Sequence, residues 1–112
     1  PILWEGNYWI ISRNDYPYER IKTHLIIVPK KHIERLPEIS FRSAVDLIKA
    51  IRRIHQNFSF LGCSLLIRSG EMSCTGATIA HLHIHLIIGE LKGDNTESLK
   101  IKIGYKQKKP PE

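Results

Sequence analysis

The stretch Ala80-His81-Leu82-His83-Ile84-His85-Leu86-Ile87-Ile88 alternates histidine with aliphatic residues and decides how the chain is organised. Successive side chains of a β-strand point to opposite faces, so this alternation predicts a strand with three histidines on one face. At about 3.3 Å per residue, the three imidazoles would span roughly 13 Å. Histidine titrates close to neutral pH, so such a row suits proton transfer, nucleophilic attack or metal binding. The apolar end of the stretch predicts a strand in the interior of a sheet.

The length and charge of the chain limit what it can be. It has 112 residues, of which 42% are hydrophobic and 25% charged, as in one soluble globular domain over residues 1–112. Its net charge of +6 favours an anionic partner: a phosphorylated small molecule, nucleic acid or an anionic membrane. Part of that charge lies in residues 104–112, which we expect to form a flexible basic tail.

The cysteine pattern indicates the compartment. Cys63 and Cys74 form no Cys-x-x-Cys pair, and the sequence contains no signal-peptide pattern and no long apolar run. We therefore expect reduced thiols, a cytoplasmic location and no membrane partner.

The rest of the sequence predicts further strands and one long helix. A turn at residues 6–7 precedes a strand that ends at residue 12, and further strands are expected over residues 22–29 and 63–69. A last short edge strand is expected over residues 98–105. Helical spacing covers residues 41–58 after the N-cap Ser40. We expect its core-facing stripe to comprise Phe41, Ala44, Val45, Ile48, Ile51, Ile54 and Phe58.

Residues 70–78, Gly-Glu-Met-Ser-Cys-Thr-Gly-Ala-Thr, predict a loop directly before the histidine stretch. Its backbone N–H groups and hydroxyls are groups that bind phosphate. Ordinary turns have the same composition, so the loop alone is a weak indication of function.

Several of these stretches together resemble the histidine triad (HIT) family of nucleotide hydrolases and transferases. The signature of that family is His-φ-His-φ-His-φ-φ, where φ is apolar, and residues 81–87 match it in full. Residues 24–33, His-Leu-Ile-Ile-Val-Pro-Lys-Lys-His-Ile, are similar to the upstream strand that carries a fourth active-site histidine. Residues 76–80 are similar to the family's Gly-x-Ser/Thr approach to the triad. With Asn-Asp-Tyr-Pro-Tyr at 14–18, the resemblance is strongest over residues 9–88.

The resemblance implies an α+β fold of the HIT type, in which one long helix packs on an antiparallel sheet of about five strands. It also implies a nucleotide-binding hydrolase that acts at the α-phosphate of a dinucleoside polyphosphate or a nucleoside phosphoramidate. The covalent nucleotidyl-histidine would be released by water, or by phosphate in a nucleotidyltransferase or phosphorylase. We expect a purine nucleotide, adenine for preference, a homodimer, and no cofactor beyond a divalent cation that accompanies a polyphosphate.

Within this resemblance, His83 takes the position of the nucleophile. A neutral imidazole can attack when one ring nitrogen is free and a hydrogen-bond acceptor holds the other. His81 and His85 would flank His83, where they hold the phosphate oxygens and the leaving-group side. His24 would support the site from the neighbouring strand.

Four further residues are expected to bind substrate. Thr78 matches the position whose hydroxyl contacts phosphate in the family, and Gly76 belongs to the same approach. Asn14 is the candidate for the ribose contact, although it lies further before His24 than in the family. Arg68 stands where relatives commonly carry Asn or Gln, and a guanidinium can bind phosphate with two hydrogen bonds.

Three alternatives remain open from the sequence. His24, His81 and His83 are a possible set of zinc ligands, because a His-x-His pair on a strand with a remote histidine is a known zinc geometry. A non-catalytic nucleotide-binding module would normally lack the middle histidine, which this chain keeps. An enzyme that processes nucleic-acid ends would need additional basic or zinc-finger segments, so we do not expect nucleic acid as a partner.

Overall fold

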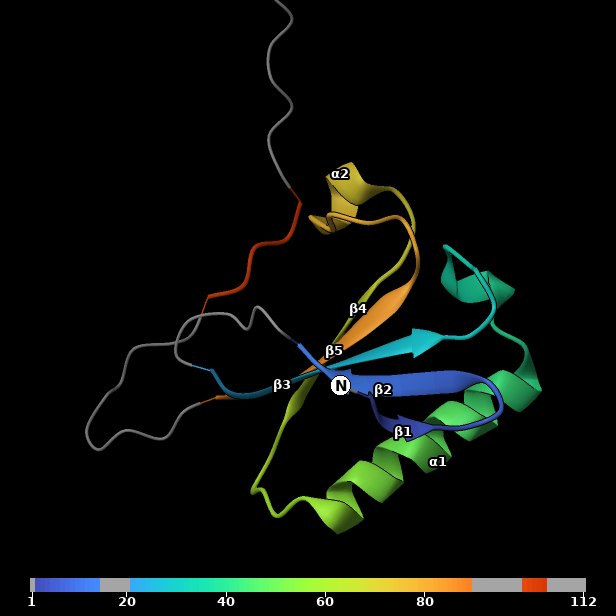
Figure 1. Cartoon of the computed structure of the whole chain (residues 1–112). Helices are drawn as coiled ribbons and strands as arrows, with labels where there is room; N and C mark the ends of the chain where they lie inside the picture. Colours follow the sequence, from blue (N-terminus) through green and yellow to red (C-terminus); the bar gives the residue numbers. More distant parts are fainter. Residues whose placement is uncertain (1, 15–20, 90–99, 105–112) are drawn as a thin grey trace, which may run out of the picture.

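The computed structural model describes residues 2–14, 21–89 and 100–104 (Figure 1). Within these residues, five strands form one antiparallel sheet in the order β1-β2-β3-β5-β4. The strands are β1 (Ile2–Glu5), β2 (Trp9–Arg13), β3 (Ile21–Pro29), β4 (Ser64–Arg68) and β5 (His83–Gly89). The helices are α1 (Phe41–Asn57), α2 (Met72–Thr75) and a 3₁₀ turn, η1 (Leu36–Glu38). The predicted α+β class, with five strands and one long helix, is confirmed.

The histidine strand β5 lies inside the sheet, between β3 and β4, as its apolar end predicts. It begins at His83, so the expected strand from residue 80 starts too early. Arg68, the last residue of β4, is paired with His83, which leaves no strand residue opposite His81. The N–H of Leu82 instead donates to the carbonyl of Ile33, at 2.8 Å. His81 therefore precedes the strand in a bend.

The expected edge strand over residues 98–105 is not formed by its described part. Residues 100–104 adopt no strand, while residues 98, 99 and 105 lie outside the described residues. The carbonyl of Lys102 accepts a hydrogen bond from the side chain of Arg68, and Gly104 has a φ of 72°, which interrupts extended backbone. The fifth strand of the sheet is β1 instead.

Helix α1 begins as predicted, because the Ser40 side chain accepts a hydrogen bond from the Ser43 N–H at 3.2 Å. The predicted core-facing stripe is wrong in part. The buried positions are Ser43, Leu47, Ala50 and Ile54, whereas Phe41, Val45 and Ile48 are exposed. The helix has two apolar stripes, and the sheet covers only one of them. The indole N–H of Trp9, at 2.8 Å from the Ser43 carbonyl, helps to fix which one.

The sheet has one covered face and one face that carries the histidines. Helix α1 packs along the first face, and α2 stands where β4 ends and β5 begins (Figure 1). The core between α1 and the sheet is aliphatic and aromatic; its fully buried side chains are Trp9, Ile11, Leu25, Ile27, Leu82, Ile84 and Leu86. Cys63 and Cys74 are free thiols. In the part of the chain that the structure describes, no helix is long and apolar enough to cross a membrane.

Candidate active site

Strand register brings three of the predicted histidines together. His85 is paired with Ile26, two residues along β3 from His24, and His83 is two residues along β5 from His85. The side chains of all three therefore project from the sheet face opposite α1. The ring centroid of His85 lies 4.9 Å from that of His24 and 4.9 Å from that of His83. All three side chains are buried.

Hydrogen bonds connect Asn14, His24 and His85 in a chain. The Asn14 amide nitrogen lies 3.1 Å from Nδ1 of His24 and 3.4 Å from its Nε2. An amide nitrogen only donates, and its contact with Nδ1 is the shorter of the two, so we assign Nδ1 of His24 as the acceptor; a neutral His24 then carries its proton on Nε2. This Nε2 lies 2.7 Å from Nδ1 of His85 and donates to it. A neutral His85 then carries its proton on Nε2.

The pKa values of this pair favour the neutral rings that the chain requires. Burial lowers the pKa of His24. Burial, followed by the charges of His83, His24 and Arg68, lowers the pKa of His85 from 6.5 to about 4. Both imidazoles are therefore neutral at pH 7, so the donor and acceptor roles above hold there.

His83 is held by the backbone of its neighbour. Its Nδ1 atom lies 2.9 Å from the carbonyl oxygen of His81. A carbonyl oxygen only accepts, so Nδ1 carries the proton and Nε2 keeps its lone pair. The arrangement that nucleophilic attack by a neutral imidazole needs, one nitrogen held and the other unprotonated, is present at His83.

His81 itself lies apart from this row. Its ring meets the ring of His32, with the centroids 4.8 Å apart, and His32 lies 3.7 Å from a carboxylate oxygen of Glu34. The Nε2 atom of His81 is buried and has no hydrogen-bond partner among the residues that the structure describes. An unsatisfied buried polar atom is costly, and a ligand that bonds to it removes the cost. The sequence did not indicate a role for His32 at the site, although Lys-Lys-His directly follows the strand that carries His24.

The residues expected to bind substrate take different positions. Asn14 follows β2 and bonds to His24, as described above. Thr78 is exposed in the bend between α2 and β5. Gly76 ends α2 with a φ of 77°, and an added Cβ there would lie 2.9 Å from the Gly104 nitrogen, so only glycine fits. Arg68 is buried, and its guanidinium donates to the carbonyls of Thr75 and Lys102.

The zinc alternative finds no support in the geometry. Among the residues that the structure describes, no three His, Cys, Asp or Glu side chains are grouped so that they could hold a metal ion. His24, His81 and His83 are all described, and they do not form such a group.

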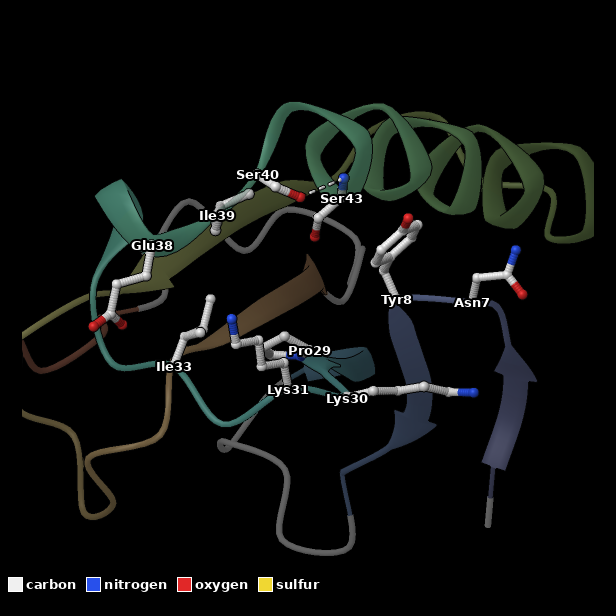
Figure 2. A pocket seen from close by; sticks show the side chains of 10 residues that line it. All are labelled: Asn7, Tyr8, Pro29, Lys30, Lys31, Ile33, Glu38, Ile39, Ser40 and Ser43. Carbon is white, nitrogen blue, oxygen red and sulfur yellow. Dashed lines mark hydrogen bonds between the residues drawn. The ribbon is translucent and has the colours of Figure 1, made fainter.

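A cavity of about 330 Å³ lies away from the histidines, at the far end of β3. Figure 2 shows its lining side chains, which come from the β1–β2 turn, the end of β3, the segment that leads into α1 and the first turn of α1. They are Asn7, Tyr8, Pro29, Lys30, Lys31, Ile33, Glu38, Ile39, Ser40 and Ser43. Pro29 lies five positions along β3 from His24, which is about 16 Å of extended strand. None of His24, His81, His83 and His85 lines this cavity.

Comparison with known proteins agrees with the geometry. The HIT domain family model matches residues 3–91. A HIT-like protein of Chlamydia trachomatis is 33% identical over 95 residues, which is 81% of this chain and 82% of the relative. The protein named hit of Bacillus subtilis is 32% identical over 77 residues, which is 65% of this chain and 52% of that protein.

Two solved structures extend the match to three dimensions. A HIT family hydrolase from Clostridium thermocellum has a TM-score of 0.65 and 27% identity, and the match covers 87% of this chain and 85% of that one. A histidine triad nucleotide-binding protein from Sulfolobus tokodaii has a TM-score of 0.62 and 26% identity, with 96% and 72% covered. The chain belongs to the histidine triad family.

Proposed function

We propose that this protein is a nucleotide-binding hydrolase that transfers a nucleotidyl group to His83 and then to water. Its substrates would be dinucleoside polyphosphates or nucleoside phosphoramidates, with a purine base, preferably adenine. The observation that carries the proposal is the hydrogen bond from His83 Nδ1 to the His81 carbonyl, at 2.9 Å. This bond leaves the lone pair of Nε2 as the nucleophile.

In the first step, Nε2 of His83 attacks the α-phosphorus and forms a P–N bond. The bond from phosphorus to the leaving group breaks, and the leaving group departs with the electron pair and takes up a proton from solvent. In the second step, water attacks the same phosphorus and releases a proton to solvent, and the P–N bond breaks to give a nucleoside monophosphate and free His83. With inorganic phosphate as the acceptor, the product would be a nucleoside diphosphate.

His85 and His24 would stabilise the developing phosphate charge. A His85 ring with its proton on Nε2 donates a hydrogen bond to a non-bridging phosphate oxygen without a proton transfer. His24 and Asn14 support this role, because their hydrogen bonds fix the tautomer of His85. A donor that is already oriented needs no reorganisation when the negative charge forms.

His81 would face the leaving group. Its buried Nε2 atom lacks a partner among the described residues, so a bound substrate would satisfy it. Thr78, exposed in the bend before His81, would contact the phosphates, and Gly76 would allow the turn that places it. A ribose contact at Asn14 stays a prediction, and its bond to His24 gives it a second candidate role. The net charge of +6 favours such anionic substrates.

Exposed apolar side chains on the edge strand β4 and on helix α1 support a homodimer. Leu65 and Ile67 of β4 are paired with Leu86 and Ile84, so they share the sheet face that α1 covers. They are nevertheless 45% and 40% exposed, and the outer stripe of α1 formed by Phe41, Val45 and Ile48 is exposed as well. Exposed apolar side chains gathered on one element are typical of protein interfaces. A second copy of the chain would cover them.

The experiment that tests the proposed function is product analysis after incubation with diadenosine tetraphosphate and, separately, with an adenosine phosphoramidate. Each is run with and without inorganic phosphate. We expect AMP from at least one substrate, and ADP in its place if phosphate is the acceptor. If neither substrate is consumed, the proposed reaction is wrong.

A further inference from the structure

Arg68 lies beside the triad and holds two segments from elsewhere in the chain. It is 6% exposed and paired in register with His83. Its Nη1 donates to the carbonyl of Thr75, at the end of α2, and its Nη2 to the carbonyl of Lys102, at 3.1 Å. A guanidinium is always charged, so its burial requires partners such as these. One side chain therefore joins β4, α2 and residues 100–104.

The two segments that Arg68 holds also meet directly, backbone against backbone. A Cβ added to Gly76 would lie 2.9 Å from the nitrogen of Gly104, and one added to Gly104 would lie 3.3 Å from the carbonyl of Ser73. Both glycines have positive φ, 77° and 72°. This crossing fits only residues without a side chain, so the contact between residues 73–76 and 102–104 has a defined geometry.

The crossing lies directly before the part of the chain that leads into the triad. Ala77 is buried, and its N–H donates to the Thr75 hydroxyl at 3.1 Å. Thr78 and His81 follow within six residues of Thr75. The position of these two residues relative to His83 thus depends on where α2 ends, and Arg68 fixes that point.

We propose that Arg68 is a positioning residue that clamps residues 100–104 to the end of α2 and thereby sets which leaving groups the triad accepts. The inference rests on the proposed function, because His81 and Thr78 are the residues assigned there to the leaving group and the phosphates. Arg68 acts through its contacts with the carbonyls of Thr75 and Lys102. Its positive charge, which also contributes to the low pKa of His85, is a separate effect.

The test compares two substrates that share the adenylyl group, an adenosine phosphoramidate with a small leaving group and diadenosine tetraphosphate with a large one. In Arg68→Gln we expect kcat for the small leaving group to fall roughly 10–100-fold, because its alignment depends on the clamp. The kcat for diadenosine tetraphosphate, which has the large leaving group, should fall less. The ratio of the two kcat/KM values therefore shifts. An equal loss for both substrates would overturn the proposal.

Two further variants separate the clamp from charge and from folding. Arg68→Lys keeps the charge but lacks the planar guanidinium that donates to two carbonyls, so its selectivity should match that of Arg68→Gln. Wild-type selectivity in Arg68→Lys would contradict the clamp. Gly104→Ala disturbs the same contact without touching Arg68, and it should shift selectivity in the same direction. The double variant Arg68→Gln/Gly104→Ala should be less than additive. The matched controls are Arg53→Gln, which removes an exposed arginine, and Gly62→Ala, where an added Cβ would meet no atom within 4 Å.

The clamp is also tested without any substrate. Backbone amide NMR signals of residues 76–82 and 100–104 should shift in both Arg68→Gln and Gly104→Ala, and stay in place in the two controls. If Arg68→Gln leaves residues 100–104 unchanged, the clamp is wrong whatever the enzyme does. If the amide signals shift but the wild type consumes neither substrate, the clamp stands as structure and the proposed function fails.

Discussion

The Nε2 atom of His24 lies 2.7 Å from the Nδ1 atom of His85, across the β3–β5 pairing. One of the two nitrogens must donate, and the amide of Asn14 at Nδ1 of His24 determines which. His24 donates, so His85 keeps its own proton on Nε2. A residue beyond the end of β2 thus fixes the tautomer of a histidine in the centre of the sheet.

The substitution Asn14→Asp should reverse the direction of the hydrogen bonds from residue 14 through His24 to His85. A carboxylate accepts from Nδ1 of His24, so Nε2 of His24 then accepts from His85, and His85 is left with an unprotonated Nε2. We expect kcat to fall about 10²–10⁴-fold, as when a triad histidine is held in the wrong tautomer. The tautomers are read from imidazole ¹⁵N shifts. Asn7→Asp, on the β1–β2 turn, is the matched control.

The same variant tests the other role predicted for Asn14. If Asn14 contacts only the ribose, its substitution raises KM and leaves kcat and the His85 tautomer unchanged. A loss confined to KM would therefore contradict the hydrogen-bonded chain and favour the ribose contact.

The low pKa of His85 predicts a loss of stability in mild acid. Its pKa is about 4 in the folded protein, against an ordinary value of 6.5. Between these values the unfolded chain binds a proton that the folded protein does not, so the free energy of unfolding falls as pH drops from 6.5 toward 4. Above pH 6.5 neither state is protonated at His85, and this contribution is constant.

Urea unfolding measured at several pH values between 7 and 4.5 checks this expectation. His85→Gln should show a shallower decline than the wild type, whereas His55→Gln, which removes an exposed histidine of α1, should match the wild type. Equal slopes in all three proteins would show that His85 is not held neutral by the fold.

The exposed apolar stripe of α1 predicts that the protein forms a homodimer through this surface. Ile48→Asp places a charge in the proposed interface, and Leu65→Asp does so on β4. Sedimentation equilibrium should show a dimer for the wild type and a large shift to monomer for both variants, because a buried unpaired charge is unfavourable. Ile2→Asp, an exposed isoleucine on the opposite edge strand β1, should remain dimeric. A monomeric wild type would contradict the proposed dimer.

The sequence predicted those parts of the molecule that local patterns determine. The period-two alternation correctly placed His83 and His85 on one face, and Ser40 marked the start of α1. The stripe of α1 was predicted in part wrongly because Leu47 and Ile48 are adjacent residues of similar hydrophobicity. Contacts with the sheet, among them the hydrogen bond from Trp9 to Ser43, select the buried side. Residue pattern alone does not choose between two apolar stripes.

Contacts between distant segments were the part that the sequence did not reveal. Arg68 and Lys102 are 34 residues apart, and no local pattern joins them. Arg68 was expected to bind phosphate, and the contacts of its guanidinium with the carbonyls of Thr75 and Lys102 were not predicted. His32 was missed as a neighbour of His81, because its contact arises from the way the chain returns after β3.

The central claim is that His83 becomes covalently nucleotidylated, and trapping this intermediate tests it most directly. The protein is mixed with excess diadenosine tetraphosphate, quenched in base within the first turnover, and digested for peptide mass spectrometry. We predict one adenylyl group on the peptide that contains His83, and none in His83→Gln, whose kcat should fall roughly 10⁴-fold or more. AMP formed at an undiminished rate by His83→Gln, or an adenylyl group on another residue, would contradict the account.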